Sequence, residues 1–262
     1  MQSPVFFIDV DRTLASFAQQ AGEKAVCEFL SKFWPREVAE EFPKVFLGVQ
    51  EFYHGDRKAS NLELVNKLNS YVSKTSSPKF NVMFSRELYI KYLSEKHQLK
   101  ISDSQITEAA EAYWAAIAKN SRIYDDSIRF LESGKDAYII AGTDGWVRIN
   151  GKNIAYDAEY SKEKRLQRTK AIGLSKYFSD GRIIIGDPHD KPSEEFWKTC
   201  TNVAHLASPK SGIVIDDSIT IVASAKQFGF KGILIDRAGR YDKEDVKRKT
   251  DEYITNFDEL KF

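Results

Sequence analysis

The sequence predicts an α/β protein with a Rossmann-like parallel-sheet core and an inserted α-helical cap domain. From residue 124 to residue 262, short apolar runs alternate with helix-forming segments, a pattern typical of βαβ units and a parallel sheet. One further apolar run, Val5–Asp9, precedes a long stretch in which every pattern is helical. We therefore expect a core of residues 1–14 and 124–262 whose first strand is separated from the others by a cap of residues 15–123.

The cap is expected to consist of helices separated by short breaks. Apolar residues recur with helical spacing from Val26 to Phe33, and Pro35 ends or bends that helix. Ser102 and Gln105 have the spacing of a capping box at the start of the last cap helix. The predicted helices are 22–34, 36–53, 61–72, 85–97 and 102–119, with a polar loop at 73–81.

The core is expected to have one strand before the cap and to alternate strands and helices after it. The apolar run in Val5–Asp9 is continuous, which predicts a strand buried on both faces. Residues 144–157 are expected to form a β-hairpin around Asn150-Gly151. The later predicted strands are 137–143, 182–187, 212–217, 232–236 and 252–254, and the predicted helices are 127–133, 161–178, 192–206 and 218–228.

The composition excludes several classes of protein. The 262 residues include 39 Lys and Arg and 38 Asp and Glu, so the formal net charge is +1. This balance argues against binding to nucleic acid or to a membrane surface through bulk electrostatics. No apolar run approaches the roughly 18 residues that a membrane span needs, and no signal-peptide pattern is present. We expect a cytoplasmic protein in which Cys27 and Cys200 are reduced thiols packed in apolar surroundings.

Polar residues interrupt the apolar runs where the core strands end. Asp9 and Asp11 end or follow the first strand, Thr143 ends the second, and Asp216 and Asp217 end the run GIVIDD. The carboxyl ends of parallel strands lie at one edge of a sheet, and ligands of such sheets bind there. We therefore expect these side chains to form one site.

Four carboxylates at one edge repel one another unless a cation shares the site. Mg²⁺ suits such a set because it prefers oxygen ligands. Thr143 and Lys191 suit a ligand that is an anion with several oxygens, such as a phosphate. One carboxylate can then attack phosphorus, while a second protonates the leaving oxygen and later deprotonates water.

Each motif also has a simpler explanation when it is taken alone. An Asp-x-Asp sequence or Thr143-Asp144-Gly145 can be a turn. Asp216 and Asp217 can cap the helix that follows them, and Lys191 can be a surface lysine. The functional interpretation therefore depends on the motifs occurring together.

Taken together, the motifs resemble those of the haloacid dehalogenase-like (HAD) superfamily. The likeness is to its phosphatases with a helical cap inserted after the first motif, which are relatives of phosphoglycolate phosphatase and β-phosphoglucomutase. The order and spacing match over residues 1–14 and 124–262, whereas residues 15–123 match only as a helical insert of suitable size. The segments that carry the resemblance are FFIDVDRTL, YIIAGTDG, DKPSEEFW and GIVIDDSITIVASAKQFGFKGILID.

The resemblance implies a Mg²⁺-dependent phosphatase that hydrolyses a small phosphorylated metabolite through an aspartyl-phosphate intermediate. It implies that Asp9 is the nucleophile and a metal ligand, and that Asp11 is the general acid and base with its backbone carbonyl on the metal. Asp217 would ligate the metal, and Asp216 would ligate it or hold a metal-bound water. The implied phosphate-binding residues are Thr143, Asp144 through its backbone amide, and Lys191.

Arg12 departs from the family pattern, because a small residue usually follows the second aspartate. It is expected either to reach a second anionic group of the substrate or to lie at the hinge of the cap. Three other functions stay open: a haloacid dehalogenase, a phosphomutase, and a non-catalytic binding module on an enzyme fold. Dehalogenases of this kind need no metal and lack the second aspartate, so Asp11 argues against that function.

Overall fold

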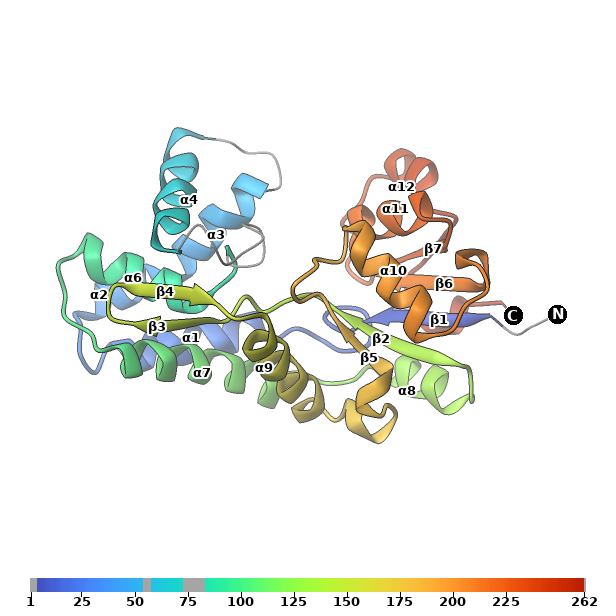
Figure 1. Ribbon diagram of the computed structural model, residues 1–262, viewed down its shortest axis with the longest axis horizontal. Coiled ribbons are helices and arrows are strands. Elements are labelled where there is room, and N and C mark those ends of the chain that lie inside the picture. The colour runs from blue at the N-terminus through green and yellow to red at the C-terminus, as the bar shows by residue number, and fades with distance from the viewer. Residues whose placement is uncertain (1–3, 54–57, 73–82, 262) are drawn as a thin grey trace. The chain divides into compact units, whose positions relative to one another are not determined.

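The computed structural model describes residues 4–53, 58–72 and 83–261 (Figure 1). The chain divides into two compact units. The core unit consists of Met1–Phe17, Ser121–Gly142 and Thr169–Phe262, and the cap unit consists of Ala18–Asn120 and Thr143–Arg168. The polar loop predicted at 73–81 lies outside the described residues.

The core unit is built on a six-stranded parallel sheet in the order β5-β2-β1-β6-β7-β8. The first strand of the chain pairs with β2 on one side and β6 on the other (Figure 1). This confirms the predicted Rossmann-like core, with a first strand completed by strands that follow the insert. The strands are β1 Val5–Asp9, β2 Ala137–Ala141, β5 Ile183–Ile185, β6 Gly212–Asp216, β7 Lys231–Ile235 and β8 Glu252–Ile254.

Alternate side chains of β1 pack against opposite faces of the sheet, as the period of two requires. The Phe6 ring meets the Phe130 ring edge-on at 5.3 Å on one face. On the other face the Phe7 ring meets the Phe230 ring at 5.6 Å, and Phe230 lies 5.5 Å from Trp197 between ring centroids. All five β1 residues are buried, as the continuous apolar run predicts.

Among the described residues, three helices of the core unit lie where the sequence pattern predicts them: α8 Asp125–Glu132, α10 Glu194–Val203 and α11 Ile219–Gln227. The predicted helix 161–178 ends earlier, because Gly173 adopts a left-handed φ of 102°. The last helix was not predicted, because its sequence KEDVKRK buries only Val246 and shows no apolar stripe. The last helix is α12 Lys243–Lys249, and α9 Ala158–Ala171 is shared between the units.

Arg237 joins the two segments of the core unit that precede and follow the main insert. Its guanidinium donates to the Thr13 carbonyl at 3.0 and 3.1 Å and to the Asp126 carboxylate at 2.8 and 3.2 Å. Ser16 and Arg122 add a backbone hydrogen bond of 2.9 Å between the same segments. The chain that leaves the sheet after β1 is thereby held beside the chain that returns to it.

Among the described residues, six helices of the cap unit come from the predicted helical insert. The capping box is confirmed, since the Gln105 side chain accepts from the Ser102 amide at 2.8 Å and Ser102 Oγ accepts from the Gln105 amide at 3.2 Å. The predicted helix 36–53 is two helices, because Pro43 is accepted only in the first turn of a helix, where a new one begins. The helices are α1 Gln19–Leu30, α2 Arg36–Ala39, α3 Phe42–Tyr53, α4 Ala59–Tyr71, α6 Arg86–Lys96 and α7 Asp103–Asn120.

The predicted hairpin is present as β3, Val147–Asn150, paired antiparallel with β4, Asn153–Tyr156. It belongs to the cap unit, so the observed units differ from the predicted boundaries over residues 143–168. Two polar contacts with α7 explain this placement: Asp103 accepts from the Gly151 amide at 2.6 Å, and Lys164 pairs with Glu111 at 2.6 Å. The cap unit is therefore made from two separate stretches of chain.

A buried arginine lies at the centre of the cap unit. Arg86 is 3% exposed, and its guanidinium lies 4.5 to 4.7 Å from the ring centroids of Phe46, Tyr113 and Trp114. It also donates to the Tyr113 hydroxyl at 2.9 Å. Cation–π contacts of this kind are strongest where water is excluded, so aromatic rings at helical spacing here stabilise a charge as well as filling the core.

Glu87, the residue after Arg86, has a buried carboxyl whose effect on the stability of the protein can be measured. It is 1% exposed, and burial raises the pKa of its carboxyl from 4.5 to about 7, against the hydrogen bond from Ser85. The folded state therefore keeps a proton that the unfolded chain loses, so stability falls as the pH rises from about 4.5 to 7. We expect Glu87→Gln to raise the free energy of unfolding by about 2 to 4 kcal/mol at pH 8.

Urea unfolding of both proteins at pH 8 and pH 4 measures this effect. The difference is expected to vanish at pH 4, where Glu87 is protonated in both states. Equal stability at pH 8, or a less stable variant, would show that Glu87 is ionised and satisfied in the folded protein.

Candidate active site

The carboxyl ends of β1 and β6 lie side by side in the sheet. Ile8 pairs with Ile215, so Asp9 and Asp216, the next residues, end the two strands at the same level. From this pair the sheet continues through β2 and β5 on one side and through β7 and β8 on the other. Ligands of open α/β sheets bind beyond the carboxyl ends of the strands at such a switch point.

Lys191 lies between these two carboxylates. Its Nζ donates to Asp9 Oδ1 and to Asp216 Oδ2, the latter at 2.8 Å. All three side chains are buried, with at most 8% exposed, which excludes the surface-lysine explanation. Lys191 is positioned by the start of α10, where the Ser193 hydroxyl accepts from the Phe196 amide at 3.2 Å and caps the helix.

Asp217 completes an acidic cluster with Asp9 and Asp216. One carboxylate oxygen from each residue lies within 4.8 Å of the others, and no second group of this kind occurs among residues 4–53, 58–72 and 83–261. A set of three carboxylates supplies only hard oxygen ligands, which is the chemistry that Mg²⁺ prefers. The residues present therefore fit a magnesium ion.

Asp216 also has the local function that its sequence position allows. Its Oδ1 accepts from the Ser218 amide at 2.8 Å, just before α11 begins at Ile219. With Lys191 on Oδ2, both of its oxygens are engaged. The same carboxylate therefore orders the start of the helix and pairs with Lys191, whereas its role at a metal ion stays a prediction.

The electrostatics of the site show an excess of buried negative charge. The pKa of Asp9 is raised to about 7, chiefly by burial, with contributions from Asp216 and Asp11 and against the effect of Lys191. Burial and Asp9 together raise the pKa of Asp217 to about 6. Burial lowers the pKa of Lys191, but Asp216 and Asp9 outweigh it and the net shift is upward. A cation would relieve this repulsion and keep the carboxylates ionised.

Asp11 lies in a tight loop that follows β1. The Ala15 amide donates to the Val10 carbonyl at 2.9 Å, and the Arg12 amide donates to the Ala15 carbonyl at 2.6 Å. Asp11 is half-buried, and its charge is close enough to raise the pKa of Asp9. The structure thus brings the second predicted carboxylate to the site.

Arg12 has a left-handed backbone conformation, with φ 65°, which explains why a small residue is usual at this position. Its guanidinium lies 5.3 Å from the centroid of the Phe17 ring. Phe17 is the last residue of the core unit before the main insert. Both expectations for Arg12, the cap hinge and a second anionic group of the substrate, stay predictions.

The two residues predicted from the second motif have partners in the cap unit. Thr143 Oγ1 accepts from the Gly145 amide at 2.9 Å, which is the turn that Thr-Asp-Gly favours. Asp144 is buried and accepts two hydrogen bonds of 2.8 Å from Arg168, with Arg165 at 3.7 Å. Contact of Thr143 or Asp144 with a phosphate stays a prediction.

Sequence reasoning missed two residues that contact Asp217. Arg240 Nη2 donates to the Asp217 carbonyl at 2.6 Å and to its Oδ2 at 2.8 Å. The Tyr241 hydroxyl donates to the same carbonyl at 3.1 Å. No sequence motif marks these residues, because they follow β7 and reach Asp217 only when β6 and β7 pair in the sheet.

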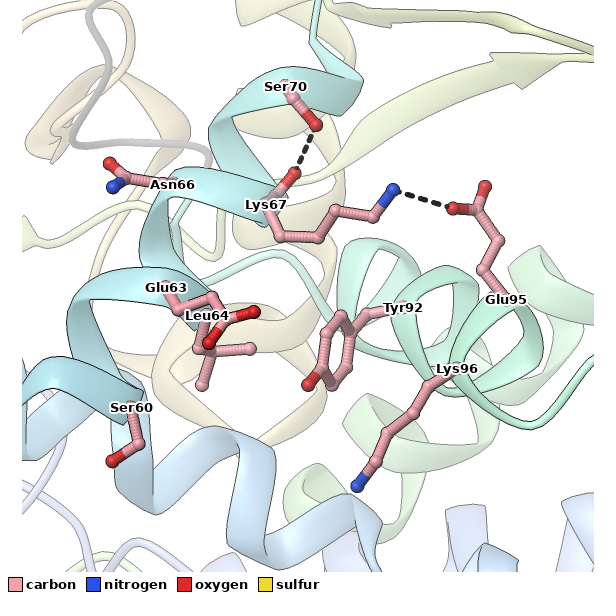
Figure 2. Close-up of a pocket in the computed structure, with 9 residues that line it drawn as sticks. All are labelled: Ser60, Glu63, Leu64, Asn66, Lys67, Ser70, Tyr92, Glu95 and Lys96. Carbon is pink, nitrogen blue, oxygen red and sulfur yellow. Dashed lines mark hydrogen bonds and ion pairs between the residues drawn. The ribbon is translucent and has the colours of Figure 1, made fainter.

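A large cavity of about 740 Å³ lies in the cap unit between α4 and α6 (Figure 2). None of its lining residues was predicted as a site residue. Its two lysines are paired with carboxylates: Lys67 with Glu95 at 3.0 Å and Lys96 with Glu41 at 2.8 Å. Figure 2 shows the Lys67 ammonium pointing to the Glu95 carboxylate. The cavity offers no cluster of metal ligands and is not the candidate active site.

Two further expectations concern the cysteines and membrane-spanning segments. Cys27 and Cys200 are free thiols. The expected apolar surroundings are found for Cys200, which is buried in the core, but not for Cys27, which is half-buried with Glu23, Glu28 and Glu40 close enough to act on it. Burial and these carboxylates raise the pKa of Cys27 to about 11, and burial raises that of Cys200. No helix among the described residues is long and apolar enough to cross a membrane.

Comparisons with known proteins agree at the level of fold. No family model matches the chain, and no curated protein matches it in sequence. A 2-haloacid dehalogenase from Pseudomonas syringae pv. Tomato DC3000 has a TM-score of 0.60 at 16% identity, over 98% of this chain and 95% of that one. HAD-hydrolase YfnB from Bacillus subtilis, bound to magnesium, has a TM-score of 0.57 at 14% identity, over 99% and 97%.

A HAD phosphatase from Thermococcus onnurineus is similar as well, with a TM-score of 0.54 at 18% identity over 99% of this chain and 96% of that chain. These structures include a dehalogenase as well as a phosphatase, so their likeness bears on architecture and not on the reaction. With the parallel sheet, the inserted helical unit and the acidic strand ends, it shows that this chain has the fold of the haloacid dehalogenase-like (HAD) hydrolases.

Proposed function

We propose that the protein is a hydrolase, a Mg²⁺-dependent phosphatase of a small phosphorylated metabolite, and that Asp9 is its nucleophile. The main support is the buried arrangement in which Lys191 joins Asp9 to Asp216, with Asp217 completing the cluster. A site that holds a lysine and several carboxylates at a sheet switch point suits a phosphate and a divalent cation together.

In the first step, an ionised Asp9 oxygen attacks phosphorus in line with the leaving group, and the bond from phosphorus to the leaving oxygen breaks. Asp11 donates its proton to that oxygen, so the product leaves as a neutral alcohol. Lys191 neutralises charge on the phosphoryl oxygens, and the backbone amides of the tight loop after β1 donate to them. The protein then carries a phosphoryl group on Asp9.

In the second step, the Asp11 carboxylate takes a proton from water, whose oxygen attacks the same phosphorus. The bond between Asp9 and phosphorus breaks, and inorganic phosphate leaves. Asp9, Asp217 and the Asp11 carbonyl would hold the magnesium ion, with Asp216 as a ligand or as the holder of a bound water. Bound Mg²⁺ supplies charge neutralisation and Lewis acidity at the phosphoryl oxygens.

A haloacid dehalogenase is the second candidate, because one of the similar structures has that name. The acidic cluster and Asp11 favour the phosphatase, since attack on a carbon–halogen bond needs neither a metal nor an acid at that position. A phosphomutase would use the same residues and would differ only in passing the phosphoryl group to a sugar instead of water.

Removal of the metal distinguishes these functions. We expect the purified protein to release phosphate from an aryl phosphate with Mg²⁺, to lose at least about 10²-fold in rate in EDTA, and to recover when Mg²⁺ is returned. Halide release from 2-chloropropionate is expected to be absent under all three conditions. Halide release that persists in EDTA, without phosphate release, would establish the dehalogenase and overturn the proposal.

A further inference from the structure

The loop after β7 contacts the acidic cluster at Asp217. In the sequence this loop follows Asp217, whereas Lys191 precedes it. The loop runs from Asp236, which directly follows the strand, to Tyr241. The buried Asp236 carboxylate accepts from the Tyr241 amide at 3.1 Å and pairs with Arg240 Nε at 3.5 Å. Asp236 is 1% exposed, so the loop is fixed to the sheet by a carboxylate that holds both residues.

Both residues then reach Asp217. Arg240 Nη2 bonds the carbonyl and Oδ2 of Asp217, at 2.6 and 2.8 Å, and the Tyr241 hydroxyl bonds the same carbonyl at 3.1 Å. The Tyr241 hydroxyl also accepts from the Ile219 amide at 3.4 Å, at the start of α11. The backbone carbonyl and one carboxylate oxygen of Asp217 are therefore held by the loop after β7, and Asp217 itself directly follows β6.

The other oxygen of Asp217 is left open. Among the described residues, Oδ1 accepts no hydrogen bond, whereas the Asp217 side chain as a whole is only 14% exposed. A hydrogen bond on Oδ2 restricts rotation of the carboxylate and leaves Oδ1 as the oxygen available to an ion. Such a partner fixes the ligand before the metal arrives, and removing it typically weakens metal binding by 10- to 100-fold.

We propose that Arg240 is a positioning residue for magnesium, which holds Asp217 Oδ2 so that Oδ1 is presented to the ion. The inference rests on the proposed magnesium site. The positive charge of Arg240 would by itself repel the ion, but its side chain is 36% exposed, so water and salt screen that repulsion. The gain from holding the Asp217 carboxylate in place therefore outweighs the repulsion between Arg240 and the ion, and Arg240 strengthens magnesium binding.

The test is a calorimetric titration of Mg²⁺ into the metal-free protein. Arg240→Met removes the donors and is expected to raise the Mg²⁺ dissociation constant about tenfold or more. Both contacts to Asp217 come from one nitrogen, so Arg240→Lys, whose single ammonium has three protons, is expected to recover most of the affinity. Arg248→Met is the matched control, because Arg248 is exposed and, within the described part of the chain, its ion pair is with Asp245 of the same helix, α12.

Thermal unfolding without Mg²⁺ separates positioning from folding. Arg240→Met removes the cation paired with the buried Asp236, so its midpoint is expected to fall below that of Arg248→Met, and Arg240→Lys is expected to recover the midpoint together with the Mg²⁺ affinity. The titrations are made well below both midpoints, where each variant is folded, so that a weaker Mg²⁺ affinity cannot be ascribed to unfolding. An unchanged or lower dissociation constant in Arg240→Met would overturn the proposal, and so would a midpoint that falls while Arg240→Lys recovers no affinity.

Asp217→Asn distinguishes failure of this inference from failure of the magnesium site. If Asp217→Asn binds Mg²⁺ weakly while Arg240→Met binds it normally, the metal site stands and the positioning role is wrong. If the unchanged protein binds no Mg²⁺, or if Asp217→Asn binds it as well as the unchanged protein does, both proposals fall.

Discussion

Replacing Asp9 with asparagine is expected to abolish phosphate release, with a loss on the order of 10⁴-fold or more in kcat. Asparagine has the shape of aspartate but no ionised oxygen, so it cannot form the bond to phosphorus. It also removes one carboxylate from the acidic cluster. The rate is measured on an aryl phosphate with saturating Mg²⁺, and circular dichroism checks that the variant is folded.

Asp245→Asn is a suitable control for this substitution. Asp245 lies on α12 in the same unit, and its partners Arg248 and Lys249 are on the same helix. It is expected to leave kcat within about twofold, because surface changes away from special features have small effects. A folded Asp9→Asn protein that keeps more than a tenth of the activity would show that Asp9 is not the nucleophile.

Replacing Lys191 with methionine is expected to damage both stability and activity. Lys191 is the cation between Asp9 and Asp216, and all three side chains are buried. Removing one partner of a buried ion pair leaves an uncompensated charge and typically costs 3–5 kcal/mol, so we expect a loss of about 3 kcal/mol at pH 8 without metal. The loss of a phosphate ligand should lower kcat by about 10² to 10³.

The stability loss in Lys191→Met is expected to depend on pH. Lys191 opposes the upward shift in the pKa of Asp9, so without it the folded carboxyls hold their protons to higher pH. Protonation removes the repulsion between them, and the loss should therefore shrink as the pH falls from 8 to 5. Urea unfolding at both pH values measures it, and a loss of equal size at both would mean that Lys191 stabilises through packing alone.

The sheet and the carboxylate positions could be predicted because their signals are local. The run Val5–Asp9 ends in a carboxylate, and so does Gly212–Asp216. Parallel pairing then brings any two such strand ends together, whatever lies between them in sequence. The rule that parallel strands end at the same edge of a sheet was therefore enough to expect Asp9 and Asp216 close together.

The parts that could not be predicted depend on contacts between distant segments. Arg240 reaches Asp217 only because β7 pairs with β6, and nothing in the sequence around Arg240 marks it. The hairpin of β3 and β4 was predicted from its turn, but its place in the cap unit depends on the bond from the Gly151 amide to Asp103. Local periodicity carries no information about either contact.

The most direct test of the account is whether Asp9, with magnesium, accepts a phosphoryl-shaped group. Beryllium trifluoride has the tetrahedral shape of a phosphoryl group when it bonds to a carboxylate oxygen, and it requires no knowledge of the substrate. Fluorine NMR of the protein with beryllium fluoride is expected to show a bound signal that needs Mg²⁺ and is absent in Asp9→Asn. A bound signal that persists in Asp9→Asn, or no bound signal in the unchanged protein with Mg²⁺, would contradict the central claim.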